Sequence, residues 1–465
     1  MYTYCLYRSF PFFCKMALHK PGLQLEVSNR QILKIALPIS LALLVPQLNF
    51  ITNNIFLGHY NEKSLAIASI TGVYYLIFAG IGYGLNNGLQ ALISRRAGEN
   101  RPEEIGKLFS QGVYIALGIA AIGILLTYFV APAILHKALR SELTYIEAIK
   151  FLRIRIWGLP FLYIYQMRNA LLVGTNQGRY LVAGTLAETL SNIFFDYVLI
   201  FGNFGFPELG FNGAAFASII AEFTGMFVIF AVIHRKGISK RFSLFKSYKI
   251  DPYNSRLIAS MSAPLVFQHA ISIISWEFFY ILVEHHGERD LAISNTMRNI
   301  FGFFGVLTWS FAATANTMVS NIIGQGKKHE VIPLIHRIVR LSAVLSLIVC
   351  LLLNLMPSLF LSVYGQGPDF VAQALPVVRV VSLAMMLMSF ATVWLNAVTG
   401  TGNSRMTLSI EFIAIILYSI YVWVVLEKYK LSITYGWMSE WLYWISIFTF
   451  SFIYIRSGRW KAKVI

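Results

Sequence analysis

Charged side chains are scarce in this sequence. Asp, Glu, Lys and Arg make up only 13% of the 465 residues, whereas 57% are hydrophobic and 15% are aromatic. A soluble domain carries about 25% charged residues, so the composition excludes a soluble globular protein and indicates one embedded in a lipid bilayer. The 38 Lys and Arg residues outnumber the 21 Asp and Glu residues, yet they fall in short loops between apolar runs. That grouping is a topology signal and does not predict nucleic acid as a partner.

Cysteine is also rare. Cys5, Cys14 and Cys350 have no metal-ligand spacing and indicate no disulfide framework. The sequence lacks a GxxxxGK(S/T) phosphate loop, and its His, Cys and acidic residues do not cluster at metal-ligand spacing. These absences argue against an enzyme and against ATP hydrolysis within this chain, and we expect no cofactor.

The first 20 residues contain an apolar run that Arg8 and Pro11 interrupt. Such a run fits neither a signal peptide nor a spanning helix. Met16 is an alternative start, and the first span would then serve as an uncleaved insertion signal. Residues 1–20 therefore carry no predicted span.

Apolar runs of spanning length recur along the rest of the chain. About 20 apolar residues cross a bilayer as a helix. The predicted spans are 32–57, 65–93, 108–132, 151–174, 180–201, 211–233, 257–283, 291–323, 335–356, 376–399, 406–426 and 433–455. Lys and Arg concentrate on one side of these spans, chiefly in residues 235–249 and 456–463. The positive-inside rule then places both termini in the cytoplasm, which requires an even number of spans.

The two halves of the chain align with each other at a constant shift of 226 residues. Because each half has six spans, the copies enter the membrane in the same orientation. Parallel repeats of this kind occur in transporters, whose substrate sites lie between or within the halves. The matched landmarks are Pro38 with Pro264, HYNEKSLAI from His59 with HHGERDLAI from His285, Gly98 with Gly324, and Gly174 and Thr175 with Gly400 and Thr401.

The predicted fold is an all-α membrane protein with twelve transmembrane helices in two six-helix lobes that are related by this parallel repeat. The predicted divisions are an N-terminal cytoplasmic segment (1–25), an N-lobe (26–233), a cytoplasmic linker (234–256), a C-lobe (257–456) and a cytoplasmic tail (457–465).

Asp196 lies inside the apolar fifth span. A carboxylate at membrane depth costs roughly 2.5–3.5 kcal/mol on insertion scales, so it normally faces a wet or protein-lined interior and marks a path for ions or substrate. Asn192 lies four residues earlier, on the same helix face. The alternative is that Asp196 lies near the outer end of its helix, close to Asn203, and caps the helix or reaches the interface.

Several motifs together resemble the multidrug and toxic compound extrusion (MATE) family, in its prokaryotic type. The order and spacing of these motifs in a layout of six plus six spans resemble the family over residues 25–460. The motifs are Asn53 to Gly58 at the end of a proline-led first span, the Arg-Arg-Ala-Gly turn at 95–98, the Gly-Gln-Gly turn at 324–326, NxxxD at 192–196, and Gly213-Ala214-Ala215 at the start of the sixth span.

The resemblance implies two lobes around a V-shaped cleft and export of small organic cations by antiport with Na⁺ or H⁺. It also implies a cation-coupling site in the N-lobe formed by Asn192, Asp196 and Ser218. Many prokaryotic members place an Asp at the position of Asn53, so this chain has one carboxylate there where those members have two. Two readings stay open. Either Asp196 is ionised and binds Na⁺ with the oxygens of Asn53, Asn192 and Ser218, or desolvation favours H⁺ on Asp196.

Three glutamates are further candidates for coupling or substrate binding. Glu188 precedes Asp196 by two turns, and the alternative is that it pairs with a base near Arg179. Glu277 lies in the middle of the seventh span, on the helix where one branch of the family carries a coupling glutamate. Glu411, in the eleventh span, is a C-lobe candidate to bind a proton or a cationic drug; the alternative is a structural pair with Arg405.

The remaining polar and aromatic residues within spans have plainer explanations. Glu222 and Glu440 are expected to serve helix packing, and Arg168 and Arg298 to form structural salt bridges. Gln268 and His269 are candidates for the cleft floor, with a packed, hydrogen-bonded histidine as the alternative. Trp309 and Trp394 are deep enough to offer π-faces to organic cations, although an interfacial belt is the usual role of membrane Trp residues.

Three classes of function remain. The favoured one is a cation-coupled drug exporter, expected to be a monomer in the bacterial inner (cytoplasmic) membrane. A second is a flippase of lipid-linked saccharides from the same broad superfamily, for which a strongly cationic cleft and often two extra spans are expected. The third is a membrane scaffold or channel that transports nothing against a gradient.

Overall fold

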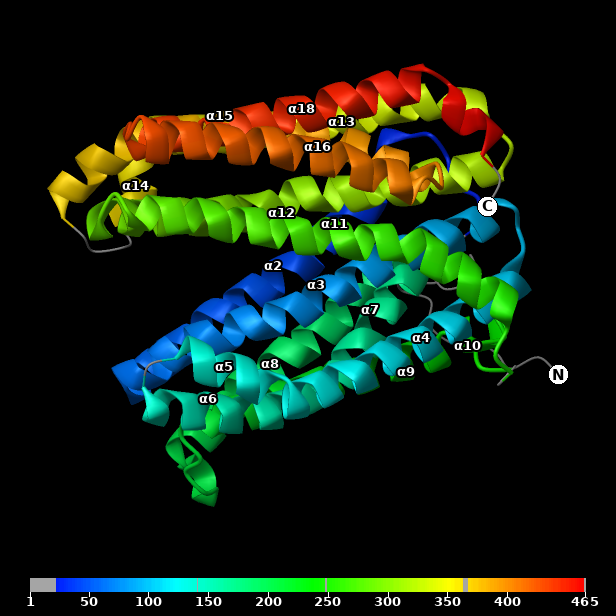
Figure 1. Cartoon of the computed structure of the whole chain (residues 1–465). Coiled ribbons are helices and arrows are strands. Elements are labelled where there is room, and N and C mark those ends of the chain that lie inside the picture. The colour runs from blue at the N-terminus through cyan, green and yellow to red at the C-terminus, as the bar shows by residue number, and fades with distance from the viewer. Residues whose placement is uncertain (1–21, 140, 247–248, 363–366, 464–465) are drawn as a thin grey trace, which may run out of the picture.

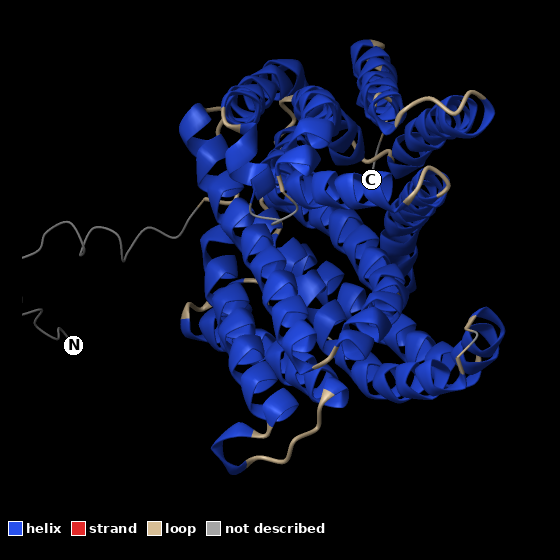
Figure 2. Cartoon of the chain, turned by 90° about the vertical axis from the view of Figure 1, so that its left-hand side faces the viewer, coloured by secondary structure: helices blue, strands red, loops and turns tan. Residues whose placement is uncertain are grey.

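The computed structural model describes residues 22–139, 141–246, 249–362 and 367–463. Every regular element among these residues is a helix (Figure 1; Figure 2), which confirms the all-α prediction. The prediction for residues 1–20 lies outside the described residues. The long helices are α2 (Asn29–Tyr60), α3 (Glu62–Gly98), α4 (Pro102–Phe129), α6 (Glu142–Arg155), α7 (Leu159–Gly174), α8 (Leu181–Phe201), α9 (Phe211–Arg235), α11 (Pro252–Glu284), α12 (Glu288–Gly324), α13 (Val331–Leu355), α15 (Pro368–Gly400), α16 (Ser404–Val422) and α18 (Ser439–Arg456). The short ones are α5 (Ala131–Ala138), α10 (Ile238–Arg241), α14 (Pro357–Leu361), α17 (Ile433–Trp437), the π-helix η6 (Trp423–Lys428) and the 3₁₀ turns η1 (Ile156–Gly158), η2 (Gly178–Tyr180), η3 (Asn203–Gly205), η4 (Lys328–Glu330) and η7 (Arg459–Ala462).

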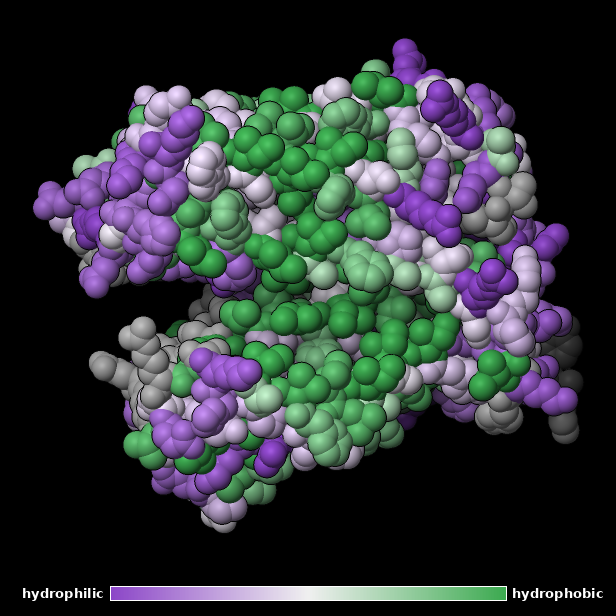
Figure 3. Space-filling model, in the orientation of Figure 1, coloured by the Kyte–Doolittle hydropathy of each residue, from purple (hydrophilic) through white to green (hydrophobic). Residues whose placement is uncertain are grey.

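The helices form two lobes, as predicted. Helices α2 to α9 make the N-lobe and α11 to α18 make the C-lobe, and the lobes meet at the end of the molecule where α2 begins and α18 ends (Figure 1). They diverge toward the opposite end, which carries α5, α6 and α14. The space-filling view shows a deep notch between the lobes at that opposite end (Figure 3). We call these the closed end and the open end.

The internal repeat is visible in the helix bounds. Helix α3 begins at Glu62 and ends at Gly98, and α12 begins and ends 226 residues later, at Glu288 and Gly324. Helices α6 and α7, joined by η1, cover residues 142–174, and α15 covers 368–400 at the same shift. The two halves therefore have one architecture, and the helices of the C-lobe can be matched residue by residue to those of the N-lobe.

One difference between the repeats has a local cause. Pro160 has no backbone N–H, so the i to i−4 hydrogen bond at that point cannot form, and the chain makes the 3₁₀ turn η1 before α7 begins. The counterpart of Pro160 is Met386, and α15 runs through this point without a break.

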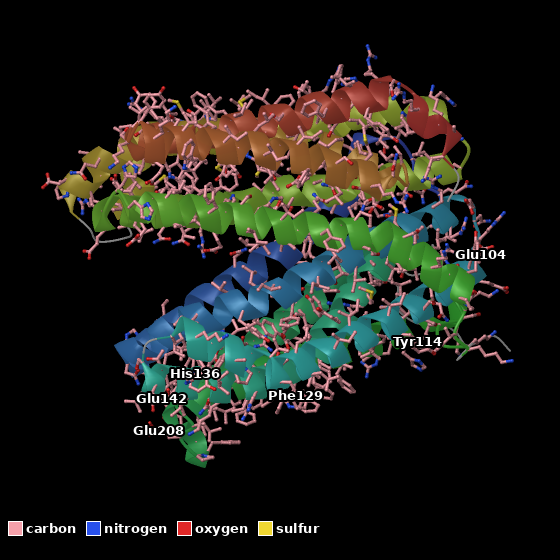
Figure 4. All side chains as sticks on the ribbon, in the orientation of Figure 1. Glu104, Tyr114, Phe129, His136, Glu142 and Glu208 are labelled. Atoms are coloured by element: carbon pink, nitrogen blue, oxygen red, sulfur yellow. The ribbon has the colours of Figure 1, made fainter. Side chains whose placement is uncertain are left out.

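The outer surface is suited to a bilayer. A hydrophobic band crosses the visible face between two hydrophilic ends (Figure 3), and exposed apolar side chains of this kind include Leu125, Phe129, Phe227 and Ile274. In Figure 4, Glu104 lies at the closed end, whereas His136, Glu142 and Glu208 lie at the open end. Among the described residues, seven helices are each long and apolar enough to cross a membrane. The other predicted spans, in α2, α6 with α7, α8, α12 and α18, include those that carry Arg155, Arg168, Asn192 and Asp196.

The lobes touch most closely where α3 crosses α12 at the closed end. A Cβ added to Gly98 would lie 2.0 Å from the carbonyl oxygen of Asn321, and one added to Gly324 would lie 2.4 Å from that of Arg95. Asn321 is the repeat counterpart of Arg95, so the two contacts are reciprocal, as expected across a two-fold axis. Glycine is needed at both positions because the two backbones approach so closely.

Reciprocal hydrogen bonds fasten the same crossing farther toward the open end. Gln90 Nε2 donates to the carbonyl of Ala313 at 3.0 Å, and Asn316 Nδ2 donates to the carbonyl of Asn87 at 3.1 Å. These two bonds are also related by the shift of 226. Buried polar groups that satisfy each other in this way favour one relative position of the lobes.

The segment before α2 crosses the closed end and binds both lobes. Gln24 Nε2 donates to the carbonyl of Gly98 on α3, at 3.0 Å, whereas the Leu25 amide donates to Asn321 Oδ1 on α12, also at 3.0 Å. Asn321 Nδ2 donates in return to the Leu23 carbonyl at 2.9 Å. Leu23 and Leu25 are buried. The closed end is thus sealed by packed backbone and by paired polar groups.

The segment between the lobes is tied to α4. The Asp251 amide donates to Gln111 Oε1 at 3.1 Å, and Gln111 Nε2 donates to the Lys249 carbonyl at 2.9 Å. The exact divisions given above for the lobes, linker and tail stay predictions.

Candidate functional site in the N-lobe

Asp196 is fully buried inside the N-lobe. Its exposed fraction is 0%, and that of Asn192 is 2%. Asn192 Nδ2 donates to Asp196 Oδ2 at 2.7 Å, so the two side chains lie on one face of α8, as their spacing predicts. This distance lies at the short end of the usual range for an N–H donor and an oxygen acceptor.

Asp196 does not reach the outer interface. Asn203, the neighbour invoked for a capping role, donates to the Tyr197 carbonyl at 3.1 Å. Helix α8 ends at Phe201, and Gly202 after it is in a left-handed conformation with φ of 71°. Glycine adopts this conformation without strain and ends helices commonly. The alternative in which Asp196 reaches the interface is therefore wrong, because its side chain faces the protein interior.

Helix α2 brings Asn53 to the level of this pair. Helices α2 and α8 run in parallel, and two contacts fix their register: Gln31 bonds Asn176 at 2.9 Å, and the rings of Phe56 and Phe201 lie 6.2 Å apart. Both contacts join residues that differ by 145. The same register sets Asn53 opposite residue 198, which is about 3 Å along the axis from Asp196 at 1.5 Å per residue.

Helix α9 brings Ser218 to the same level as Asp196. Helices α8 and α9 are antiparallel, and Ser191 bonds Thr224 at 3.3 Å, while Gly213 packs on the carbonyl of Leu199. These contacts set Asp196 opposite residues 216–219, so Ser218 lies in the adjacent turn. Ser218 is half-buried. The four predicted coupling residues therefore lie at one depth on three neighbouring helices.

Arg155 and Glu222 form an ion pair inside the N-lobe. Arg155 Nη2 lies 2.5 Å from Glu222 Oε1, and Nη1 lies 3.0 Å from Oε2, so the pair is bidentate. The guanidinium also stacks on the ring of Tyr75, 3.8 Å from its centroid, and the Tyr75 hydroxyl donates to Glu222 at 3.2 Å. Glu222 thus has an electrostatic partner, beyond the packing role that we expected.

Sequence reasoning missed Arg155. A signal was available in the sequence. Arg155 lies inside the predicted span 151–174, and Glu222 lies at similar depth in another predicted span. Gly158 makes room for the pair, because a Cβ at this position would lie 2.2 Å from Glu222 Oε2 and 2.4 Å from Arg155 Nη1.

Glu188 and Arg168 lie nearer the closed end, on either side of the point where Gly184 and Gly225 meet. A Cβ on Gly225 would lie 2.9 Å from Glu188 Cβ, and one on Gly184 would lie 2.4 Å from Arg168 Nη1. Arg168 is fully buried and stacks on Tyr165 at 3.6 Å. The base beside Glu188 is therefore Arg168, since Arg179 bonds Tyr180 instead. No carboxylate oxygen among the described residues lies within ion-pair distance of Arg168, so its predicted salt bridge is wrong.

Glu277 and Trp309 lie on the helix faces that turn toward the N-lobe. Ile273 of α11 is within 3.3 Å of a Cβ built on Gly80, and Glu277 follows one turn later on the same face. Trp309 precedes Ala313, which bonds Gln90, by one turn of α12. Both positions are on the open-end side of these contacts, where the lobes diverge.

One predicted cleft residue, Trp394, lies in the C-lobe interior and not at the cleft. Trp394 is 2% exposed, and its ring packs on those of His336, Phe448 and Phe452. Its predicted role at the cleft is therefore wrong. Gln268 is half-buried, and its Nε2 faces Glu411 Oε2 at 3.5 Å, so its place at the cleft floor stays a prediction. His269 does lie between the lobes, with its ring 5.5 Å from that of Tyr83.

Two further expectations change. Arg298 is exposed and lies over the Tyr280 ring at 5.5 Å, with no ion pair among the described residues, so its predicted salt bridge is wrong. Arg405 is exposed, and Glu411 pairs with hydroxyl groups instead of with it. Glu440 is buried at the start of α18.

The N-lobe site offers oxygen ligands only. Among the described residues no group of three or more His, Cys, Asp and Glu side chains could bind a metal ion. One carboxylate, two amide oxygens and one hydroxyl suit a hard cation, and the same carboxylate can instead bind a proton. The residues at this level therefore fit both coupling ions that the sequence left open.

Comparison with known proteins identifies the family. A family model described as MatE matches residues 38–198 and 264–424, two segments that differ by the same 226 residues as the repeat. The chain belongs to the MatE family. This family consists of multi-pass integral membrane transporters, so the chain is an integral membrane protein and its family is not one of enzymes.

Individual members of the MatE family match over most of the chain. A probable multidrug resistance protein NorM of Thermotoga maritima is 23% identical over 440 residues, 94% of each chain. The multidrug resistance protein MdtK of Cronobacter sakazakii is 26% identical over 309 residues, which cover 65% of this chain and 67% of that protein.

Solved structures share the fold. One is the outward-facing conformation of a multidrug resistance MATE family transporter of the MOP superfamily, with a TM-score of 0.86, 15% identity, and coverage of 94% of this chain and 98% of that one. A MOP superfamily transporter from Pyrococcus furiosus has a TM-score of 0.83 at 15% identity and covers 95% of this chain and 97% of that one. At such identities the likeness concerns the fold alone, and it confirms two lobes of six spanning helices each.

Proposed function

We propose that this protein is a secondary active transporter that exports small organic cations by antiport with Na⁺ or H⁺. The observation that carries the proposal is the fully buried Asp196, at one level with Asn53 and Ser218 in a lobe that borders an open notch. A carboxylate held inside a membrane protein at a cost of several kcal/mol is a functional group by default. The names of the NorM and MdtK relatives support drugs as the substrates.

In the proposed cycle, binding of the coupling ion at the Asp196 carboxylate drives a change in the position of the lobes. In the open-end state, the coupling ion enters through the notch and binds at Asp196, whose amide partner Asn192 orients it. Binding changes the charge inside the N-lobe next to the Arg155 and Glu222 pair, and this favours a different position of the lobes. A ligand shifts such an equilibrium only by the difference in its affinity for the two states, so the ion must bind the states unequally.

Proteoliposomes test the proposal. The purified protein is reconstituted, a cationic dye is supplied, and an inward Na⁺ gradient or an inward H⁺ gradient is imposed separately. We expect one gradient to drive accumulation of the dye on the side from which the ion enters, as antiport requires. We expect Asp196→Asn to reduce the initial rate of this transport by tenfold or more. Glu104→Gln, a surface change at the closed end, is the control and should leave the rate within twofold.

Two results would overturn the proposal. Either the wild-type protein moves no dye under any gradient, or Asp196→Asn transports as well as wild type. The substitution Asn53→Asp sharpens the test, because it adds the second carboxylate that many prokaryotic members have. We expect it to shift the pH dependence of transport or the preference between Na⁺ and H⁺.

We also propose that the closed end faces the cytoplasm of a bacterial inner membrane, with both termini inside, and that the protein acts as a monomer. The closed end carries Arg95, Arg96 and Arg101, as the positive-inside rule requires of a cytoplasmic face. A cysteine introduced beside Glu104 should react with a membrane-impermeant maleimide only after cells are opened, whereas one beside Glu142 should react in intact cells. The reverse pattern would refute the orientation.

The two other functions predict different outcomes in the same vesicles. A flippase of lipid-linked saccharides would move labelled lipid and leave the dye in place, and the acidic Glu277 on the cleft-facing side of α11 speaks against a strongly cationic cleft. A scaffold or channel would show no accumulation of dye against its own gradient.

A further inference from the structure

A second buried carboxylate lies inside the C-lobe. Glu411 of α16 is 3% exposed. Its Oε1 accepts hydrogen bonds from the Ser272 hydroxyl at 2.6 Å and from the Tyr443 hydroxyl, and its Oε2 faces the amide nitrogen of Gln268 at 3.5 Å. Three different helices, α11, α16 and α18, therefore converge on one carboxyl group.

All partners of Glu411 are neutral groups. No ion pair in the described part of the chain includes Glu411, in contrast to Glu222, which has Arg155 at 2.5 Å. An ionised carboxylate that is buried without a counter-charge is costly, and proteins usually avoid the cost by keeping the group protonated. The neutral acid keeps all three contacts, because a hydroxyl can accept as well as donate.

The charged and titratable groups on the neighbouring helices lie away from this carboxyl. On α18, Tyr443 contacts it, and Glu440 is one turn farther toward the open end. On α11, His269 and Glu277 turn toward the N-lobe. On α15 and η6 the nearest charged residues are Arg379 and Glu427. Each lies more than ten residues along its helix from the level of Glu411, which is a distance on the order of 20 Å. Glu411 thus has no cation to stabilise its charge.

Hydrogen bonds hold the Glu411 cluster together. Ser272 Oγ and Glu411 Oε1 are 2.6 Å apart, which is the separation of two oxygens that share a hydrogen. Gln268, Ser272 and Tyr443 are each only half-buried, so the cluster is not sealed from its surroundings.

The repeat relates this cluster to the N-lobe site. Helices α11, α16 and α18 are the counterparts of α2, α8 and α9, the three helices around Asp196. The counterpart of Glu411 is Thr185, which lies eleven residues before Asp196. Eleven residues make about three helical turns, so the two carboxyl groups occupy the same face of equivalent helices, with Glu411 about 16 Å nearer the closed end.

We propose that Glu411 is a second proton-binding site, which takes up and releases H⁺ in the C-lobe independently of Asp196. The proton binds a carboxylate oxygen of Glu411 and leaves to water on the opposite side when the lobes reorient. This inference rests on the proposed antiport. It assigns H⁺ to the C-lobe whichever ion binds at Asp196, and one transport cycle then carries one proton more than the N-lobe site alone would carry.

Infrared difference spectroscopy tests proton binding without any need for transport. Spectra of the purified protein are recorded between high and low pH, and a carboxylic acid C=O band that appears on acidification reports each titrating group. We expect Glu411→Gln to remove one such band, which Asp196→Asn leaves in place, and Tyr443→Phe to shift it. If Glu411→Gln leaves the spectrum unchanged, the inference is wrong.

Transport measurements distinguish this inference from the proposed function. Under an imposed pH gradient, Glu411→Gln should lower dye export about tenfold and reduce the number of protons moved per dye, whereas Glu411→Asp should retain export within about threefold. Thermal unfolding checks that each variant folds. A Glu411→Gln variant with wild-type proton movement overturns the second site alone, and an Asp196→Asn variant with wild-type export overturns the proposed function alone.

Discussion

The two lobes have the same arrangement of helices, but different groups surround the buried acidic side chains in each lobe. The N-lobe interior contains Asp196, Glu188 and Glu222 together with two arginines, Arg155 and Arg168. The C-lobe interior contains Glu411 and Glu440 with hydroxyl and indole groups around them and no interior arginine or lysine among the described residues. At the positions of Arg155, Arg168 and Asp196 the C-lobe has Val381, Trp394 and Val422.

This contrast shows that a duplicated helical frame does not fix the electrostatics inside it. The frame depends on apolar faces, helix lengths and glycines at crossings, and these recur at the shift of 226. A buried charge depends on one or two partner side chains, which can change without moving a helix. The two lobes can therefore respond to different ions, or to the same ion at different pH.

The largest expected effect concerns the arginine in the N-lobe. Arg155→Leu leaves Glu222 buried without its counter-charge, and removal of one partner of a buried ion pair costs about 3–5 kcal/mol. We expect the free energy of unfolding to fall by that amount. Installing the C-lobe residues at both positions, Arg155→Val with Glu222→Phe, should recover most of the loss. Thermal unfolding in detergent measures both, and if the double variant is no more stable than the single one, the lobes are not interchangeable here.

The next effect concerns the repeat-equivalent positions 192 and 418. Asn192→Ala removes the donor to Asp196, and hydrogen bonds to charged groups contribute about 1.5–3 kcal/mol. The apparent affinity for the coupling ion should fall at least tenfold. Tyr418→Phe in the C-lobe keeps the ring that packs on Phe279 and Tyr443 and should alter the affinity less than twofold. Equal effects of the two changes would remove the distinction between the lobes.

The glycines at the crossing should behave alike in both lobes. Gly98→Ala and Gly324→Ala each place a Cβ against a backbone carbonyl, and overpacking costs about 1–3 kcal/mol. Gly302 has nothing within 4 Å of an added Cβ, so Gly302→Ala serves as the control and should not destabilise the protein. We also expect the two crossing variants to increase maleimide labelling at the closed end. A large effect at only one glycine would show that the contact is not reciprocal.

Helix caps at the start of the lobes should differ in their pH dependence. Ser28 caps α2 by accepting from the Gln31 amide, and Asp251 caps α11 by accepting from the amides of Tyr253 and Asn254. Either substitution to Ala should cost about 1 kcal/mol at neutral pH.

Only the Asp251 cap titrates. The amide of Asn254 and its side chain hold the pKa of Asp251 below its ordinary value. The ionised form is thus favoured by folding, and its contribution is complete above the unfolded pKa of about 3.9 and is lost as pH falls below it. The destabilisation by Asp251→Ala should therefore shrink in acid, measured as the difference in melting temperature from wild type, whereas that of Ser28→Ala should stay constant.

The smallest effect concerns the surface charges at the closed end. Glu104 lies 2.9 Å from Arg96 and 3.3 Å from Arg101, and its counterpart is Glu330. Exposed ion pairs contribute about 0–1 kcal/mol. Glu104→Ala should lower stability within that range and less so at high salt, and Glu330→Ala should have no measurable effect. A loss above that range would mean that the N-lobe charges at this end form a network.

Much of the fold could be predicted because its causes are local or repeated. The apolar runs gave helices close to their predicted bounds, and Gly98 and Gly324 stood out as landmarks because both crossing backbones require glycine. In the site, the pairing of Asn192 with Asp196 followed from helical spacing. The positions of Asn53 and Ser218 did not, since they depend on the registers of α2 and α9 against α8.

The errors have the same origin. Trp394 is of a residue type that suits a cleft, but the rotation of α15 within the C-lobe turns it to the interior. Arg155 and Glu222 are 67 residues apart in sequence, and which acid pairs with this arginine depends on how their helices pack. The partner of Glu188 was predicted near Arg179 because that residue is close in sequence, whereas Arg168 on another helix lies beside it.

The sequence by itself determined that this chain crosses a bilayer repeatedly, that its halves are copies, and that few acids lie within its apolar spans, because hydropathy and periodicity are properties of consecutive residues. Only the tertiary structure decided which acid has an arginine beside it and which has hydroxyl groups, because a buried charge is stabilised by groups that packing brings from distant helices.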